Sequence, residues 1–560
     1  MAETLYDAVV VGSGASGGWA CKRLSEAGLK VALVDAGQVQ KDSNFTEHEP
    51  AFKLKYRNMA SEVVRETRPV QGLFVGEYNA WWAANDLKEP YTTQEGMPFL
   101  WCGRIRMTGG RTNIWGRQCY RLSDLDFKAA SHDGYGEDWP ISYKDLEPYY
   151  DIVEPYVGIT GIREGWAQLP DGNFLPPMGL TCYETQFRTR VRSKLGWPVT
   201  LGRSANITRP INGRGPCHYC GPCDRGCVTH SYFNAAFTTV ADALHTGHTT
   251  HIPNAMVYQV LMDPATNTAQ GVLYIDRNDR SMHRVMGRVV ILCAQAQESV
   301  RILFNSANQQ YPNGLANSSG VLGHYLMDHV ASAGGATGEF PDIPDTPAMV
   351  RPNRPTGLYV ARFRNLATGP QQKNFLRGYG FQTWGDAAQP NFGAPGFGKA
   401  YKNEIMKPRP SHITLKGFGE CLPRWENYVE IDPNVKDAFG IPVLRFHMKY
   451  GENEKRMIED MAVSAAEMME AAGAKNIRTY ARTDVTPGLG IHEVGIARMG
   501  ANPRTSVLNQ FQQTHDVKNL FVMDGSGFTS TACQNPTLTI MSLAVRSCDH
   551  ILSEMKRGSV

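Results

Sequence analysis

Residues 519–551 read NLFVMDGSGFTSTACQNPTLTIMSLAVRSCDHI, and the order of elements in this stretch decides the fold. An apolar run at 520–523 predicts a buried strand, which leads through an acidic turn at 524–527 to a helix opening at Asn535 and Pro536. Asn is a favourable N-cap, and proline in the first turn gives up no N–H that the helix needs. The free N–H groups of this helix would stabilise an anion or an electron-accepting ring. The stretch therefore predicts one half of a cofactor cradle.

The other half is expected at the opposite end of the sequence. The apolar run DAVVV at 7–11 predicts a central parallel strand. Gly12, Gly14 and Gly17 then permit a tight turn and close approach of a pyrophosphate to a helix N-terminus, while Asp35 after the next strand would bind a ribose hydroxyl. The complete unit predicts dinucleotide binding and leaves the choice between NAD and FAD open.

Composition narrows the class of protein. The 560 residues, 42% hydrophobic and 20% charged, suffice for a large core and for more than one domain. A net charge of +3 gives no sign of a nucleic-acid surface. The first residues run directly into a strand without a signal peptide, and no apolar run is long enough to span a membrane. We therefore expect no nucleic-acid partner, no membrane span and no export by a signal of its own.

A second glycine-rich segment, RMTGGRTNIWG, occupies residues 106–116. Its paired Gly109 and Gly110, with small polar neighbours such as Asn113, suit a loop that lies against a flat ring system. Residues 41–99, before this loop, are aromatic and show no clear period. We expect an insertion made of surface loops there, in preference to a lid over the site.

Four cysteines crowd into the segment GPCHYCGPCDRGC, which favours a metal centre over a secreted disulfide framework. Cys217, Cys220, Cys223 and Cys227 have the spacing C-x2-C-x2-C-x3-C, which is typical of bacterial iron–sulfur loops. The proline that usually follows the fourth cysteine is Val228 here. The spacing predicts an iron–sulfur cluster, either 3Fe-4S or 4Fe-4S, with structural zinc and disulfides as alternatives.

The rest of the chain supplies a second sheet and a candidate base. Alternation of apolar and polar residues over 331–448 predicts a largely antiparallel sheet, with one face packed and one lining a pocket. Helices are predicted at 451–474 and after the capping pair Ser142 and Asp145. His492 lies in a glycine-flanked loop where it could act as a general base. A single histidine is more often structural, so the loop alone does not establish this role.

Taken together, these motifs resemble the glucose–methanol–choline (GMC) flavin oxidoreductases over nearly the whole chain. The resemblance rests on VVVGSGASGG with Asp35, GGRTNIWG, VILCAQAQES, LPRWENYVEI, HEVGIARMG and the terminal MDGSGFTSTACQNPTLTIMSLA. It implies an α/β fold, with a Rossmann-like FAD-binding domain and a second substrate domain built on a mainly antiparallel sheet. It also implies an FAD-dependent enzyme that oxidises the CH–OH groups of alcohols and sugars.

The resemblance also assigns roles to residues. His492 matches the family's catalytic histidine and would take the hydroxyl proton, while Asn535 matches its partner and would hold the same oxygen as flavin N5 accepts the hydride. Non-covalent FAD is expected, because the position at which some pyranose oxidases carry a linking histidine is Ile114. The predicted cofactor-binding residues are Gly12, Gly14, Gly17, Asp35, Gly109, Gly110, Asn113, Asp524, Gly525, Pro536 and Thr537.

Within the family, Cys217, Cys223 and Cys227 match a C-x5-C-x3-C loop that binds a three-iron cluster in bacterial sugar dehydrogenase catalytic subunits, and Cys220 is extra. Resemblance to the glucoside 3-dehydrogenase type implies oxidation of a glycoside at C3 and electron transfer through the cluster. It further implies a small escort subunit and a cytochrome c-type acceptor. We expect a periplasmic location reached by co-export with a signal-bearing partner, with the cytoplasm as the alternative.

Domain ranges follow from the order of these blocks. The predicted FAD-binding domain comprises residues 1–40, 100–130, 200–330 and 500–560, with the cysteine loop at 215–230, and the substrate domain comprises 130–200 and 331–499. The alternatives are a pyranose-type oxidase using O₂, a gluconate or polyol dehydrogenase, a non-catalytic electron-transfer flavoprotein and a zinc-stabilised binding protein.

Overall fold

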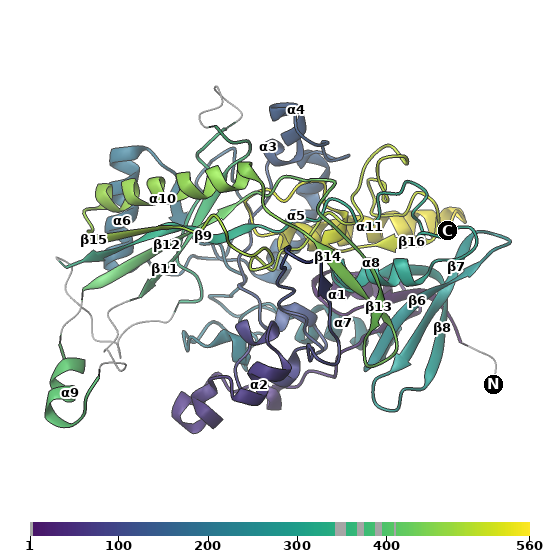
Figure 1. The fold of residues 1–560 in the computed structure, drawn as a ribbon. Helices are drawn as coiled ribbons and strands as arrows, with labels where there is room; N and C mark the ends of the chain where they lie inside the picture. The colour runs from purple at the N-terminus through teal and green to yellow at the C-terminus, as the bar shows by residue number, and fades with distance from the viewer. Residues whose placement is uncertain (1–3, 342–353, 367–373, 387–394, 408–409) are drawn as a thin grey trace.

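The computed structural model describes residues 4–341, 354–366, 374–386, 395–407 and 410–560. Two large β-sheets with helices packed against them dominate the architecture (Figure 1). One sheet is largely parallel at its centre and the other is antiparallel. This arrangement confirms the predicted α/β fold class.

The first sheet is built around the predicted N-terminal strand. β1 (Leu5–Val11) is buried over its last four residues, as suits a strand covered on both faces. It pairs in parallel with β2 (Val31–Val34) and β8 (Met282–Leu292), with Val10 opposite Leu33. The strand order is β5-β2-β1-β8-β7-β6, with β16 beside β8. The strands not yet described are β5 (Thr249–Ile252), β6 (Ala255–Asp263), β7 (Thr268–Asp276) and β16 (Leu520–Val522).

Two helices that are distant in sequence pack together on this sheet. α1 (Ala15–Glu26) follows β1 directly, and it contacts α11 (Thr537–Arg557), which is drawn in yellow in Figure 1. Arg23 Nη2 donates a hydrogen bond to Asp549 Oδ1 at 2.6 Å across this contact. The pairing brings the glycine-rich turn after β1 near the start of α11.

The other helices frame the two sheets. α5 (Tyr143–Val157) begins with the predicted capping box, in which the backbone N and Oγ of Ser142 each donate to Asp145 Oδ2 at 2.7 Å. No described helix is both long and apolar enough to cross a membrane. The remaining α-helices are α2 (Glu62–Thr67), α3 (Asp124–Phe127), α4 (Ala129–Asp133), α6 (Cys182–Leu195), α7 (Thr239–His245), α8 (Ala296–Asn305), α9 (Gly398–Ile405) and α10 (Glu452–Ala472).

The second sheet has the antiparallel pairing that the alternating sequence predicts. Its order is β15-β9-β12-β11-β10-β4, and α10 packs against β9. Met457, Met461 and Met468 of α10 are buried in the core that the helix shares with this sheet. The strands are β4 (Val199–Leu201), β9 (Val330–Phe340), β10 (Leu358–Val360), β11 (Tyr379–Asp386), β12 (Ser411–Gly419) and β15 (Lys475–Ala481).

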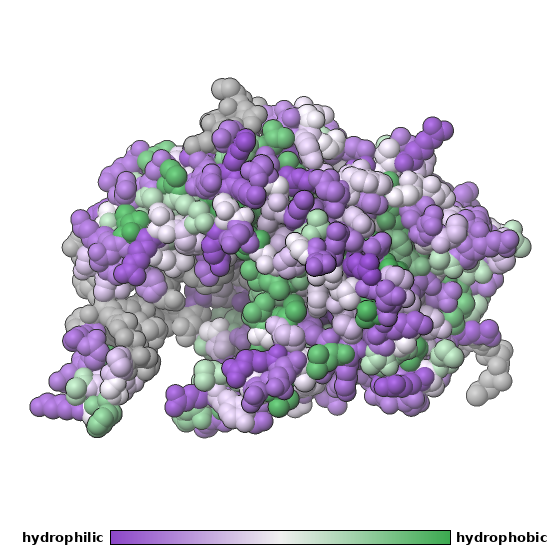
Figure 2. Space-filling model, in the orientation of Figure 1, coloured by the Kyte–Doolittle hydropathy of each residue, from purple (hydrophilic) through white to green (hydrophobic). Residues whose placement is uncertain are grey.

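A third, small sheet and the 41–99 segment complete the described chain. The small sheet contains β3 (Thr92–Thr93), β13 (Tyr428–Lys436) and β14 (Pro442–His447). Residues 41–99 form mostly short 3-10 turns and α2 around a small core that includes Trp82. Hydrophilic residues cover most of the face seen in Figure 2, with hydrophobic residues in small groups between them. The proposed domain boundaries stay a prediction.

Candidate active site

A cavity of about 540 Å³ is lined from both large sheets. The carboxyl ends of β1 and β2 border it, which is the edge where open α/β sheets bind ligands. Ten of the residues predicted for catalysis or cofactor binding line it: Gly12, Gly14, Asp35, Gly110, His492, Asp524, Gly525, Asn535, Pro536 and Thr537. The other predicted cofactor-binding residues, Gly17, Gly109 and Asn113, lie behind its wall.

The glycine turn after β1 forms one side of the cavity. Gly12 has φ +97°, and a Cβ there would lie 2.5 Å from the Cys293 carbonyl oxygen, so both conformation and space require glycine. A Cβ on Gly14 would meet no atom within 4 Å, because Gly14 borders open space at the start of α1. The first turn of α1 carries no acidic residue, so its N–H groups can receive an anion.

Asp35 is held at the same edge by the turn. Its Oδ2 accepts a hydrogen bond from the Ser13 backbone N at 2.7 Å, and its Oδ1 accepts one from the Gly37 N at 2.6 Å. Ser13 Oγ in turn accepts a hydrogen bond from the Gly109 N at 2.8 Å, which ties the second glycine loop to the first. The geometry holds an acidic side chain where a ribose would lie beside the phosphate-binding turn.

Asn113 has a structural role in the second glycine loop. Its Oδ1 accepts hydrogen bonds from Gln40 Nε2 and Asn234 Nδ2, and its Nδ2 donates to the carbonyls of Thr108 and Gly110. These bonds use all the polar positions of the buried carboxamide. Asn113 therefore shapes the loop, and Gly110 presents it to the cavity.

The start of α11 closes another side, although the expected N-cap is wrong. The helix begins at Thr537, its N-cap is Pro536, and the Asn535 side chain caps no N–H. Asn535 Oδ1 instead accepts a hydrogen bond from Gln382 Nε2 of β11 at 2.7 Å. The Asn535 carboxamide is thereby turned toward the cavity, and the first N–H groups of α11 are left for a bound group.

His492 and Asn535 meet at the cavity wall. Asn535 Nδ2 lies 3.4 Å from His492 Nε2, and the loop carrying His492 is held by Asp328, whose Oδ1 accepts the His492 backbone N–H at 2.9 Å. Burial, reinforced by His329 and Arg111, lowers the pKa of His492 well below its usual range. The ring is therefore neutral at physiological pH and can accept a proton.

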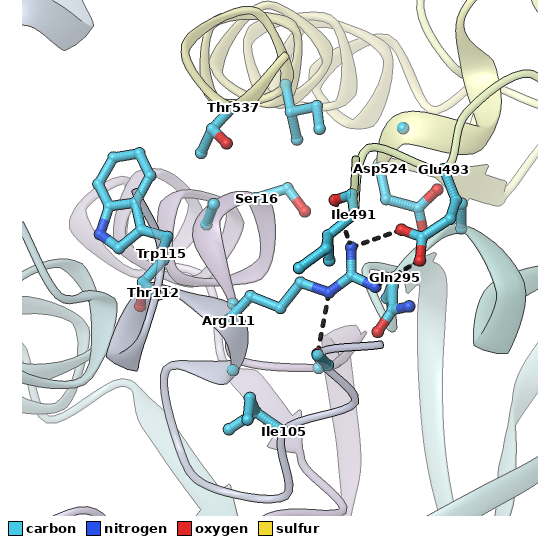
Figure 3. A pocket seen from close by; sticks show the side chains of 18 of the residues that line it. Ser16, Ile105, Arg111, Thr112, Trp115, Gln295, Ile491, Glu493, Asp524 and Thr537 are labelled. Carbon is cyan, nitrogen blue, oxygen red and sulfur yellow. Dashed lines mark hydrogen bonds and ion pairs between the residues drawn. The ribbon is translucent and has the colours of Figure 1, made fainter. Parts of the chain in front are cut away.

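Arg111 joins the second glycine loop to the loop that carries the histidine (Figure 3). Its guanidinium makes a bidentate pair with the buried carboxylate of Glu493, with Nη1–Oε2 at 2.6 Å and Nη2–Oε1 at 2.9 Å. Nη1 also donates to the Ile491 carbonyl at 3.0 Å. These bonds fix the position of His492 relative to the cofactor-facing loop.

The structure does not support the predicted metal centre. Cys217, Cys220, Cys223 and Cys227 are partly exposed, and the described residues contain no group of three or more His, Cys, Asp or Glu side chains arranged to hold a metal ion. Burial raises the pKa of the thiols of Cys217 and Cys223 and raises that of Cys220 to about 11. The described arrangement of these thiols does not support a cluster, which stays a prediction from the spacing alone.

Comparison with known proteins agrees with this geometry. Sequence models for the N- and C-terminal parts of the GMC oxidoreductases match residues 6–331 and 423–544, which is more than half of the chain. The chain belongs to the GMC oxidoreductase family. This GMC oxidoreductase is an FAD-dependent enzyme that acts on CH–OH donors.

Several relatives align with this GMC oxidoreductase. It is 30% identical to 2-methyl-1,2-propanediol dehydrogenase of Mycolicibacterium austroafricanum (97% of this chain, 95% of the relative) and 28% identical to the fructose dehydrogenase large subunit of Gluconobacter japonicus (99% of each). A shorter match, 32% over 134 residues, links 23% of the chain to 25% of a C-glycoside 3-oxidase of Arthrobacter globiformis. The crystal structure of pyridoxine 4-oxidase from Mesorbium loti shares the fold, with a TM-score of 0.62, 16% identity, and coverage of 98% of this chain and 99% of that one.

The cavity fits FAD on its own features. A Cβ on Gly14 would enter open space, and one on Gly110 would lie 3.4 Å from the Gly14 Cα, so the two glycines let the chain pass close to a pyrophosphate. Asp35 stands at the adjacent edge. The start of α11 presents N–H groups without a side-chain cap. Sequence reasoning missed five residues that organise this site, namely His329, Gln382, Asp328, Arg111 and Glu493.

Proposed function

We propose that this GMC oxidoreductase oxidises a secondary hydroxyl of a sugar or glycoside to a ketone, with C3 of a glycoside as the favoured position. The observation that carries the proposal is the pairing of a neutral His492 with Asn535 on the wall of the FAD cavity. The fructose dehydrogenase and C-glycoside 3-oxidase relatives support a carbohydrate substrate, and the latter supports attack at C3. A polyol or gluconate dehydrogenase is the alternative within the same chemistry.

His492 and Asn535 have different roles at the C–OH group that is oxidised. His492 Nε2 takes the hydroxyl proton, while Asn535 Nδ2 donates a hydrogen bond to the oxygen on which negative charge develops. FAD, when bound, supplies the acceptor for the hydride. The start of α11 adds positive potential at this point of the cavity, which favours negative charge there.

Anaerobic flavin spectroscopy tests the substrate class. We expect a methyl glycoside to bleach the flavin absorbance of the holoenzyme, while the matched 3-deoxy glycoside leaves it unchanged. A 2-deoxy glycoside serves as the control, because it keeps the C3 hydroxyl. If the 3-deoxy compound bleached the flavin as fast as the methyl glycoside does, C3 would be excluded as the position of oxidation. Bleaching by polyols alone would favour a polyol dehydrogenase.

The electron acceptor is the finer part of the proposal. We propose a dehydrogenase that passes electrons to a cytochrome c-type protein, works with a small escort subunit and reaches the periplasm with a signal-bearing partner. The large-subunit name of the fructose dehydrogenase relative supports a complex. An oxygen electrode separates this from a pyranose-type oxidase, which would release peroxide, and co-purification with cell fractionation tests the partner and the compartment.

Iron–sulfur content has a separate test, because only the spacing of Cys217, Cys220, Cys223 and Cys227 supports it. Iron and acid-labile sulfide are measured per flavin in protein purified without oxygen. Three or four iron atoms per flavin, lost in Cys223→Ser, are the expected result. The same metal analysis detects zinc, and iron-free protein that still transfers electrons to its acceptor would remove the cluster from the proposal.

A further inference from the structure

Four side chains form a continuous hydrogen-bonded row behind the cavity wall. Gln382 Nε2 lies 2.7 Å from Asn535 Oδ1, Asn535 Nδ2 lies 3.4 Å from His492 Nε2, and His492 Nδ1 lies 3.1 Å from His329 Nδ1. Gln382, Asn535 and His329 are each at least nine-tenths buried. The row comes from four separate segments: β11, the turn before α11, the loop after β15 and the residue preceding β9.

Only two hydrogen arrangements are self-consistent along this row. A neutral imidazole has one N–H and one bare nitrogen, so choosing one bond direction fixes the next. In the first arrangement hydrogens run from Gln382 toward His329, and His492 carries its hydrogen on Nδ1. In the reverse arrangement His492 carries it on Nε2 and cannot take a proton at the atom nearest Asn535. The direction of the row therefore decides whether His492 can be a base.

The proposed base needs the first arrangement. His329 Nε2 makes no hydrogen bond with the described residues, so its own contacts favour neither arrangement. A bare His492 Nε2 requires the hydrogen of that ring to lie on Nδ1, and His329 Nδ1, 3.1 Å away, must then be bare to accept it.

We propose that His329 and Gln382 are positioning residues that fix the direction of this row, so that His492 presents a bare Nε2 and Asn535 presents an N–H to the substrate hydroxyl. The inference rests on the proposed function of this site. His329 acts through His492, and Gln382 acts through Asn535. Neither side chain needs to touch the reacting carbon.

The charges around the two rings are already paired or hydrogen-bonded. Asp328 accepts backbone N–H groups from the histidine loop, including that of Gly490 at 2.9 Å. Glu493 is paired with Arg111, and Tyr450 Oη donates to the His329 carbonyl at 2.9 Å. None of these groups donates a hydrogen to His329 Nδ1 or Nε2, so the histidine pair sets its own hydrogen arrangement.

Two variants of His329 test the proposal through the pH dependence of flavin reduction by substrate. His329→Leu removes the acceptor for His492 Nδ1–H, which should slow flavin reduction by about 10- to 100-fold, the range seen when the partner of a metal-ligating histidine is lost. The acid limb of the rate should also shift, because the group that faces His492 Nδ1 influences the pKa of the imidazole. His329→Asn keeps an oxygen near the Nδ1 position and should restore both rate and profile.

Controls separate positioning from stability. His447→Gln changes another buried histidine, which is hydrogen-bonded to Gln94 and Glu430 outside the cavity, and should leave the profile unchanged. Gln382→Leu frees Asn535 to rotate and should lower the rate without moving the acid limb. A His329→Leu enzyme that keeps FAD and the wild-type profile would overturn the proposal, as would a loss that His329→Asn does not restore.

A direct readout does not depend on the variants folding. Nitrogen-15 NMR of histidine-labelled wild-type holoenzyme should show His492 protonated on Nδ1 and bare on Nε2, and the reverse tautomer would overturn the proposal. Failure of the proposed function would give a different result from failure of this inference. Alcohols and sugars would then not reduce the flavin of the wild-type enzyme, whereas the NMR spectrum would still report the tautomer of His492.

Discussion

His492 and Asn535 are 43 residues apart in sequence, yet His492 Nε2 and Asn535 Nδ2 lie 3.4 Å apart at the cavity wall. The first is carried by a loop that Asp328 and Arg111 hold, and the second by the turn before α11. A proton acceptor and a hydrogen-bond donor therefore face the same position in the cavity. Each of the following changes disturbs one part of this arrangement.

Removing the imidazole should abolish most turnover without removing the cofactor. General-base assistance contributes about 10²–10⁴-fold in rate, so His492→Ala should slow flavin reduction by that factor. FAD content measured from the flavin spectrum should stay at one per chain, because the FAD cradle lies on α1 and the glycine loops. A variant with near-normal kcat would contradict the assignment of the base.

Two glycines of the same turn should respond differently to alanine. Gly14→Ala places a methyl group in open space beside the start of α1 and should weaken FAD binding by about tenfold or more, with little effect on the FAD-free fold. Gly12→Ala forces a positive φ and a clash with the Cys293 carbonyl, so it should destabilise the protein itself. FAD titration and urea unfolding distinguish the two, and equal unfolding midpoints would contradict this reading.

Breaking the bridge between the two loops should destabilise the protein. Arg111→Met leaves the buried Glu493 carboxylate unpaired, which costs about 3–5 kcal/mol in comparable cases. The double variant Arg111→Met/Glu493→Gln should recover part of this loss, because no charge is then stranded. Urea unfolding of the three proteins measures the difference, and a double variant no more stable than Arg111→Met would count against the ion pair.

Burial of His329 should make one contribution to stability that is lost in acid. Burial lowers the pKa of His329 to about 4, so the unfolded chain binds more protons than the folded chain between about pH 6.5 and pH 4. The stabilising contribution is complete above this window and is lost as pH falls through it, by on the order of 3 kcal/mol. Asp328, whose pKa burial raises to about 7, acts with the opposite sign between about pH 4 and 7.

His329→Asn isolates the histidine term from that of Asp328. Urea unfolding at intervals from pH 7 to pH 4 should show that the stability of this variant, relative to that of the wild type, rises as the pH falls. Parallel pH curves for the two proteins would mean that His329 titrates at its ordinary pKa in the folded state.

The fold and the two ends of the site could be predicted because their signals are local. The apolar run of β1, the Gly12 turn and Asp35 occur within a short stretch, and each has a steric or electrostatic reason that needs no distant partner. The capping box at Ser142 and Asp145 is equally local. The pairing of His492 with Asn535 was predicted from family resemblance instead, because neither segment contains a sequence signal that indicates contact with the other.

What could not be predicted depends on contacts across the chain. Asn535 is a good N-cap by sequence, but Gln382, 153 residues earlier, takes its carboxamide oxygen. Asn113 resembles a cofactor ligand by position, yet Gln40 and Asn234 both donate hydrogen bonds to its Oδ1. A polar Gln382 in an apolar strand was the available signal. The cysteine spacing gives the order of the thiols along the chain, but it does not determine whether their side chains converge on one point.

The contact between α1 and α11 has a consequence for biosynthesis. Arg23 and Asp549 are 526 residues apart, so a ribosome must finish almost everything between them before these helices can meet. FAD binding is therefore a late event that follows translation. Nascent chains arrested before residue 535 should not bind FAD, so the fluorescence of added flavin should not change. Cells that produce this enzyme faster than they supply the vitamin-derived cofactor will accumulate full-length, empty protein.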